Sequence, residues 1–215
     1  PVMLNPNPET AVSRVQFVFF FSHHRKHPSV RPRFANTPSL PAHNTAYRRD
    51  VLTEVLGDDS LLAEAFLQEA INTNRPQARL VHCTHTCLGH VNMSRLYPAM
   101  RHAFLGGRIF GSQRASLLGW GPATKILRFV LFPLVPLIVI RRSAPLLRDK
   151  ASLAGTVSNF STAWILKTIH AFGESIGTCF GLGRAADAYA DLECDRGRFV
   201  RPAERHLLLG RTAPR

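Results

Sequence analysis

The sequence has few cysteines. Cysteine occurs four times in 215 residues, and no two cysteines form a Cys-x-x-Cys pair. A set this small and scattered excludes the disulfide framework that holds small secreted domains together. With no secretory leader at its start, the sequence predicts a protein of a reducing, cytoplasmic setting.

Acidic residues are also scarce. Asp and Glu together number 14 against 27 Lys and Arg, which gives a formal net charge of +13. Such a surplus favours an anionic partner, and nucleic acid, anionic lipid headgroups and nucleotide diphosphates all qualify. Nucleic acid is the least favoured of the three, because the sequence contains no recognised binding module and no interleaving of aromatic with basic residues. We therefore expect no nucleic-acid partner.

A third feature that the sequence lacks is a long uninterrupted apolar run. Residues 126–140 are almost wholly apolar but contain Arg128, Pro133 and Pro136. The charge-free part, residues 129–140, would rise only about 18 Å as a helix, against a hydrocarbon core of roughly 30 Å. A second apolar run covers residues 153–172, and the link between the two runs is basic. This pattern predicts a helical hairpin that lies in or dips into a membrane, with an ordinary pair of core helices as the alternative.

Three short motifs stand out before these apolar runs. The first is Pro-Ala-His-Asn-Thr-Ala-Tyr-Arg-Arg-Asp at residues 41–50, and the third is His-Val-Asn-Met-Ser-Arg at residues 90–95. Between them, Asp58-Asp59-Ser60 forms a helix-cap pattern, which predicts a helix over residues 61–72 that carries Glu64. Gly106-Gly107-Arg108 predicts a turn at the end of a following helix.

In this order and spacing, the three motifs resemble the second half of the catalytic domain of a family 2 glycosyltransferase. The resemblance implies an α/β fold: a partial, Rossmann-like GT-A domain over residues 1–120. The membrane-associated helical segment would then cover residues 121–183, and a mixed-charge, weakly ordered tail would cover residues 184–215. Because the chain begins where such a domain should be half finished, we expect it to be incomplete and inactive alone.

The resemblance also assigns roles to individual residues. Glu64 would be the catalytic base that deprotonates the acceptor hydroxyl, although Ala63 and Arg75 depart from the family pattern around it. The substrate-binding residues would be His43, Asn44, Tyr47, Arg48, Arg49 and His90. Arginine suits this task because its planar guanidinium binds phosphate oxygens bidentately. The alternatives remain a solvated helix residue for Glu64, surface charges for Arg48 and Arg49, and a satisfied polar residue for His90.

A divalent metal, Mn or Mg, would accompany the full-length enzyme. Its main ligands, an Asp-x-Asp pair, are expected upstream of Pro1, so this chain should contribute no metal ligand of its own. His82, Cys83, His85 and Cys87 do not predict a zinc site, because neighbouring residues on a strand point to opposite faces.

The predicted function is therefore sugar transfer with inversion, as in the hexosyltransferases of the family. A nucleotide-diphosphate sugar would be the donor, and a lipid-linked or polysaccharide glycan would be the acceptor. The reaction would take place at the cytoplasmic face of the cell membrane. The alternative is a non-enzymatic, basic membrane-peripheral protein that binds anionic lipid.

Overall fold

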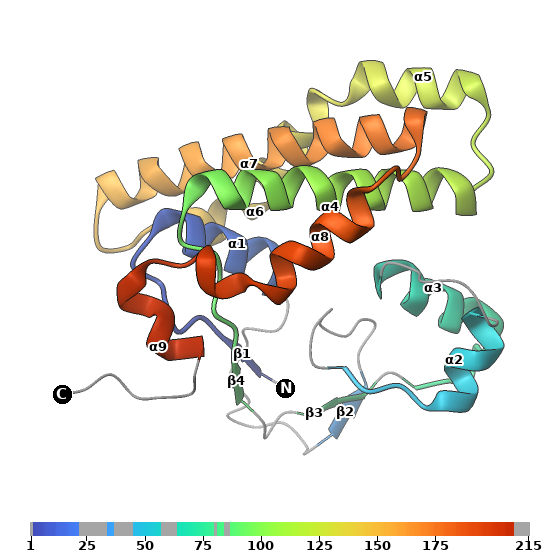
Figure 1. Cartoon of the computed structure of the whole chain (residues 1–215), viewed down its shortest axis with the longest axis horizontal. Helices are drawn as coiled ribbons and strands as arrows, with labels where there is room; N and C mark the ends of the chain where they lie inside the picture. Colours follow the sequence, from blue (N-terminus) through green and yellow to red (C-terminus); the bar gives the residue numbers. More distant parts are fainter. Residues whose placement is uncertain are drawn as a thin grey trace. The chain divides into compact units, whose positions relative to one another are not determined.

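The structure is a computed structural model that describes residues 2–21, 34–36, 45–56, 64–79, 81–83 and 87–208, and helices dominate it (Figure 1). The chain divides into two compact units. Unit 1 comprises Pro1–Leu4 and Phe20–Gly89, and unit 2 comprises Asn5–Phe19 and His90–Arg215. These boundaries differ from the predicted divisions after residues 120 and 183.

Unit 1 contains short strands that pair two by two. β1 (Val2–Leu4) runs parallel to β4 (Cys87–Gly89), and β2 (Phe34–Asn36) runs antiparallel to β3 (Val81–Cys83). The unit also holds two helices in mutual contact, α2 (Arg49–Leu56) and α3 (Glu64–Asn74). The helix predicted over residues 61–72 corresponds to α3, which ends two residues later than predicted.

The predicted α/β fold is wrong. A Rossmann-like GT-A domain needs several parallel strands in one sheet with helices on both faces. The strands of the described residues are three residues long and form two separate two-stranded sheets. Within the described residues of segment 78–84, the strand is β3, which pairs with β2. Strands this short form too few backbone hydrogen bonds to make a central sheet. The larger unit is built from packed helices instead.

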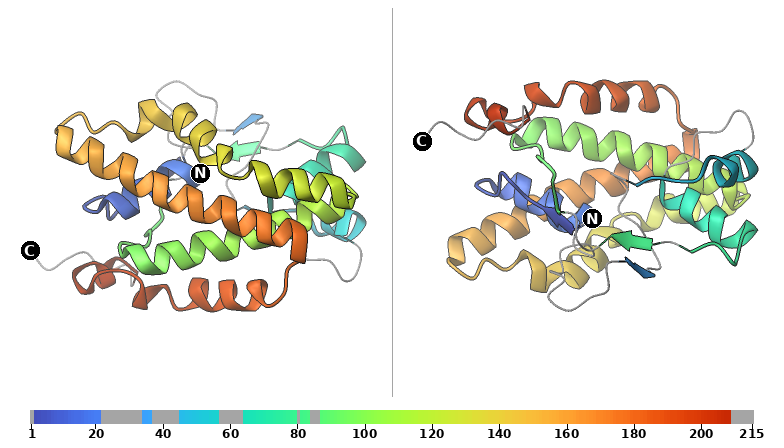
Figure 2. Two further views of the ribbon diagram at one scale, coloured as in Figure 1. Left: turned by 90° about the horizontal axis from the view of Figure 1, so that it is seen from above. Right: turned by 90° about the horizontal axis from the view of Figure 1, so that it is seen from below.

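Two long helices form the centre of unit 2. α4 (Leu96–Leu117) and α7 (Leu153–Phe180) run side by side in the same direction (Figures 1 and 2). α7 also contacts α5 (Pro122–Leu131) and α6 (Leu134–Leu147), and α4 contacts α8 (Ala185–Cys194). The long α7 is started by Ser152, whose Oγ accepts a hydrogen bond from the Gly155 amide at 2.9 Å.

Glycines bring α4 and α7 into backbone contact. A Cβ atom on Gly107 or Gly111 would overlap the backbone of α7 at His170 and Glu174, and one on Gly173 or Gly177 would overlap the backbone of α4. This Gly-x-x-x-Gly spacing on both helices lets two helices approach more closely than larger side chains allow. The predicted turn at Gly106-Gly107-Arg108 is therefore wrong, because these residues lie inside α4.

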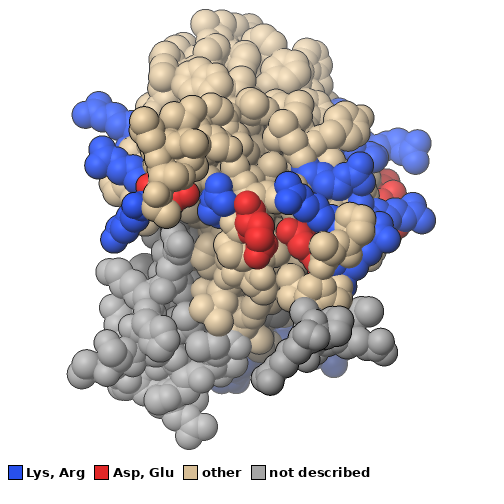
Figure 3. All heavy atoms as spheres, turned by 90° about the vertical axis from the view of Figure 1, so that its left-hand side faces the viewer, with Lys and Arg blue, Asp and Glu red and all other residues tan. Residues whose placement is uncertain are grey.

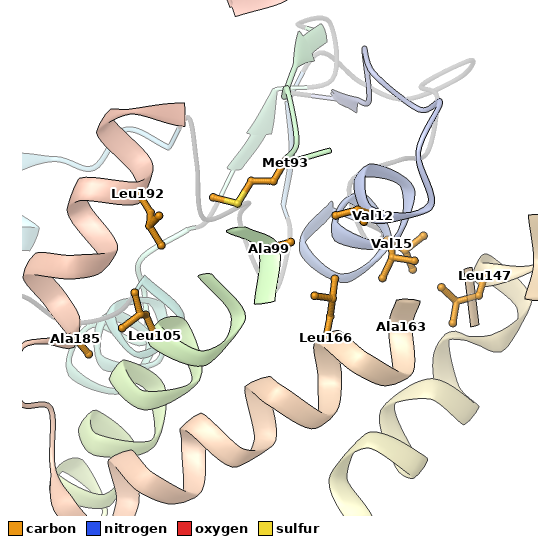
Figure 4. Packing of buried hydrophobic residues seen from close by; sticks show 11 residues of the cluster. Val12, Val15, Met93, Ala99, Leu105, Leu147, Ala163, Leu166, Ala185 and Leu192 are labelled. Carbon is orange, nitrogen blue, oxygen red and sulfur yellow. The ribbon is translucent and has the colours of Figure 1, made fainter. Parts of the chain in front are cut away.

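The core of unit 2 collects side chains from most of its helices. α1 (Ala11–Phe21) contributes Val12 and Val15, and the segment before α4 contributes Met93. Figure 4 shows these side chains converging with those of α4, α7 and α8. Ala99, Leu105, Leu147, Ala163, Leu166, Ala185 and Leu192 complete the labelled set.

Residues 184–208 are more regular than the predicted weakly ordered tail. They form α8, two short 3-10 helices, η2 (Arg196–Arg198) and η3 (Pro202–Glu204), and α9 (Arg205–Leu208). The side chains of Leu192 and Val200 are only 2% and 1% exposed, so this segment packs against the rest of unit 2.

Candidate functional site

α5 presents an apolar stripe to the outside. Ile126, Leu127, Val130 and Leu131 recur at helical spacing and are all exposed, Ile126 to 63% and Val130 to 65%. α5 has no buried residue, so the stripe is not the buried face of the helix. A surface helix of a water-soluble domain normally turns such a stripe toward the core.

The basic residues of α5 lie on its other side. Lys125 is partly buried, and the guanidinium carbon of Arg128 lies 4.8 Å from the ring centroid of Trp120. Trp120 precedes α5 in the connection from α4. The side of α5 toward the protein includes the partly buried Lys125 and Phe129, whereas Arg128 is exposed beside Trp120 and the apolar stripe faces outward.

α6 continues the exposed apolar surface. Leu134, Leu137 and Ile138 are each about half exposed, and the stripe ends one helical turn later at Arg141 and Arg142. Together with the α5 stripe, these three residues form what we call the α5–α6 apolar face. Contiguous exposed apolar surface rimmed by polar residues is typical of an interaction site.

Exposed apolar side chains also occur outside α5 and α6. On the face drawn in Figure 3, the upper part shows almost no Lys, Arg, Asp or Glu, and a band of Lys and Arg with a few acidic residues lies below it. α7 adds to the exposed apolar surface with Leu153, Val157, Trp164 and Phe172. Large unpaired apolar surfaces of this kind are uncommon on water-soluble monomers.

Among the described residues, no single helix has both the length and the apolar composition of a membrane span. α5 and α6 reach that length and composition only when taken together, and the pair is bent by 58°.

A row of ionisable side chains lies beneath α5, on α7 where it meets α4. Lys167, His170 and Glu174 follow one another at helical spacing, and Glu174 forms an ion pair with Arg114 of α4 at 3.3 Å. Burial lowers the pKa of Lys167 to about 8, and burial together with the charge of Lys167 lowers the pKa of His170 to about 3. Burial raises the pKa of Glu174, against the opposing effect of Arg114 and Arg128. His170 is therefore neutral at physiological pH.

Unit 1 contains a hollow of about 850 Å³ beside α2 and α3. Tyr47 and Arg48 line it, as do Arg75 and Arg79. Arg48 binds Asp50 through two hydrogen bonds of 3.1 and 2.9 Å, and the bond from Arg48 lowers the pKa of that carboxyl. Arg75 forms an ion pair with Glu54 and lies 3.8 Å from the carboxylate of Asp50. The hollow therefore has a basic wall whose arginines are partly neutralised by neighbouring carboxylates.

The structure brings together only part of the predicted site. Tyr47 and Arg48 line the hollow, and Arg49 is an exposed residue at the first position of α2. Glu64 is the first residue of α3, but its side chain lies outside the described part, as do His43 and Asn44 entirely. His90 belongs to unit 2 and not to unit 1.

His90 is held by a polar network. Arg196 donates a hydrogen bond of 2.8 Å to its Nε2, and its Nδ1 lies 3.2 Å from Oδ1 of Asn92. Because a guanidinium can only donate, Nε2 must accept, and the proton must lie on Nδ1. Asn92 in turn donates to Asn5, and Arg196 also pairs with Glu193, which binds His102. This network ties the segment before α4 to α8 and η2.

The sequence interpretation missed Trp120 and its two arginines. Arg114 and Arg128 both lie over the Trp120 ring, at 5.4 and 4.8 Å from its centroid. The available signal was a tryptophan between two glycines at the edge of an apolar run, a pattern typical of a membrane-interface residue. Arg128 was read only as an interruption of that run.

The described residues contain no group of three or more His, Cys, Asp or Glu side chains placed to hold a metal ion. Comparison with protein-family models, with curated proteins and with solved structures found no match for this chain.

Proposed function

We propose that the chain binds the surface of a membrane that contains anionic lipid, and that the α5–α6 apolar face enters one leaflet. The observation that carries this proposal is the outward orientation of the apolar stripe of α5, with Ile126 63% and Val130 65% exposed and no residue of α5 buried. In water this orientation exposes apolar surface at a cost of about 25 cal/mol per Å². In the acyl-chain region of a bilayer the same surface is favourably solvated.

The dimensions of the two helices fit a helix pair lying in the interface. α5 has 10 residues and α6 has 14, so neither reaches the roughly 20 residues that a bilayer span requires. The 58° bend between them lets both helices lie near the plane of the headgroups. Interfacial helices of this kind bury their apolar side about 5–10 Å deep.

Basic residues border the apolar face. Arg141 and Arg142 follow its last apolar turn, and Arg148 and Lys150 are exposed in the connection to α7. Lys and Arg near an anionic membrane surface contribute about 1 kcal/mol each, and their aliphatic stems can lie along the acyl chains. Apolar insertion and charge attraction together would give stable binding where either alone is weak.

The first test is sedimentation with vesicles of phosphatidylcholine and 20% phosphatidylglycerol. The double variant Ile126→Ser and Val130→Ser should lose about 100-fold in vesicle affinity, since each side chain contributes about 1.4 kcal/mol of burial. The control is Leu96→Ser with Tyr97→Ser, two exposed residues in the first turn of α4. Equal binding by the two double variants would refute the proposal.

A second candidate function is the sugar transfer expected from the sequence. One observation favours it: Tyr47 and Arg48, two of the predicted donor-binding residues, line the same hollow as Arg75 and Arg79. The volume of about 850 Å³ falls in the range of small-molecule sites. The planar guanidinium groups of these arginines can each bind two oxygens of a diphosphate. This candidate rests on the hollow and on the resemblance, not on the α/β fold that the structure contradicts.

The test of sugar transfer measures turnover of a panel of nucleotide-diphosphate sugars by the chain in the presence of Mn²⁺. Glu64→Gln should lower the transfer rate about 10²–10⁴-fold because the base is lost, with donor binding retained. Arg48→Gln should weaken donor binding instead. A Glu64→Gln variant with full turnover would remove Glu64 from the mechanism.

A further inference from the structure

We infer that Arg114, Trp120 and Arg128 form a binding site for the phosphate group of an anionic lipid. This inference rests on the proposed membrane binding and specifies the headgroup that the protein selects. Both arginines lie over one indole ring, Arg114 from α4 and Arg128 from α5. We call these three residues the Trp120 site.

The Trp120 site carries more positive than negative charge. Glu174 is the carboxylate nearest to it, paired with Arg114 at 3.3 Å. Arg128 forms no ion pair within the part of the chain that the structure describes, although it is exposed and its charge acts on Glu174. One carboxylate therefore faces two guanidinium groups, and the surplus charge lies on the exposed Arg128.

The position of the Trp120 site matches the boundary between water and lipid. Trp120 lies between the last turn of α4, with Leu117 and Leu118 exposed to 51% and 56%, and the apolar stripe of α5. Tryptophan concentrates at this level of a bilayer because its ring is amphipathic. Phosphate is the anionic group at the same depth, so an inserted α5 would bring lipid phosphates to Arg128.

Guanidinium groups favour phosphate over other headgroup anions. Stacking on the indole holds the planar fork of Arg128 in place, and the fork binds two phosphate oxygens at once. A phosphomonoester offers more oxygens and more negative charge than the phosphodiester of phosphatidylglycerol. We therefore expect phosphatidate to bind more tightly than phosphatidylglycerol at equal surface charge.

The experiment measures affinity for three vesicle types: pure phosphatidylcholine, phosphatidylcholine with phosphatidylglycerol, and phosphatidylcholine with phosphatidate at matched zeta potential. Arg128→Gln should lower the affinity for phosphatidate vesicles about tenfold and abolish the preference for phosphatidate. Arg142→Gln is the matched control, because it removes one exposed charge of α6 away from Trp120. Arg128→Lys keeps the charge without the fork and should retain less than half of the preference.

The outcomes separate this inference from the proposed membrane binding. If Arg128→Gln and Arg142→Gln weaken binding equally on both anionic vesicles, general charge attraction accounts for the data and the Trp120 site is refuted. Displacement of the protein's phosphatidate preference by 10 mM inorganic phosphate would also refute a lipid as the ligand. Absence of wild-type binding to any vesicle would instead refute the membrane proposal itself.

Trp120 fluorescence gives a second readout. In a Trp164→Phe background, Trp120 is the only tryptophan of the chain. Its emission should shift to the blue on phosphatidate vesicles and shift less when Arg128 is replaced by Gln. An unchanged spectrum on bound wild-type protein would place Trp120 in water and contradict the site.

Discussion

Buried ionisable residues in unit 2 make the stability of the fold depend on pH. His170 lies on α7 with its pKa lowered to about 3 by burial, by Lys167 and by His102. An unfolded histidine titrates near 6.5, so between pH 6.5 and 3 the unfolded chain binds more protons than the folded one. Stability must therefore fall as the pH drops through this window, because protonation favours unfolding.

We expect His170→Met to flatten this acid dependence. Wild type should lose on the order of a few kcal/mol of unfolding free energy between pH 7 and pH 4 beyond what the variant loses. Urea denaturation in a mild detergent at several pH values measures the difference. The same sign applies to Lys167, whose lowered pKa means that stability rises with pH between about 8 and 10.5. Parallel pH profiles of wild type and His170→Met would show that His170 is not held neutral by the fold.

At the scale of elements, the pairing of α4 with α7 depends on glycines and not on large side chains. Thr178 adds an interhelical hydrogen bond from its Oγ1 to the carbonyl of Gly111 at 3.4 Å. Because Gly111 is in direct contact with the backbone of Glu174, an added methyl group has no space without moving a helix.

Gly111→Ala should destabilise unit 2 by about 1–3 kcal/mol, although alanine favours helix formation by about 1 kcal/mol over glycine. Gly106→Ala is the matched control on the same helix, since its Cβ would meet only the ring of Tyr189 at 3.3 Å. Chemical unfolding followed by circular dichroism compares the two variants. Equal stability of both variants would show that the close approach of α4 and α7 is not required.

The sequence predicted several individual helices correctly, but it did not predict how they pack together. The helix-cap pattern at residues 58–60 correctly indicated α3, and the apolar runs of residues 126–140 and 153–172 indicated α5, α6 and α7. Glycine was misread at residues 106–107, because the same residue type serves turns and close helix contacts. The outward orientation of the apolar stripe of α5 could not be predicted, because the sequence shows that a helix is amphipathic but not which side meets its neighbours.

At the scale of the whole molecule, the residues of the predicted site belong to different compact units. Tyr47 and Arg48 meet at a hollow in unit 1, whereas His90 is bound to Arg196 and Asn92 in unit 2. A short motif shows residue types and their spacing along the sequence. The compact unit to which each residue belongs depends on contacts between segments that are far apart in the sequence. The net charge of +13 predicted an anionic partner at this scale, and that prediction stands within the membrane proposal.

The most direct test of the membrane proposal is a depth measurement on the bound protein. A nitroxide label is placed at Val130→Cys on α5 or at Tyr97→Cys on α4, with the four native cysteines replaced by alanine. Its collisions with lipid-soluble oxygen and with a water-soluble nickel chelate are then compared on vesicles with 20% phosphatidylglycerol. We predict that the label at position 130 lies about 5–10 Å below the phosphates and that the label at position 97 remains in water. A label at position 130 that stays fully accessible to the nickel chelate would contradict the proposal.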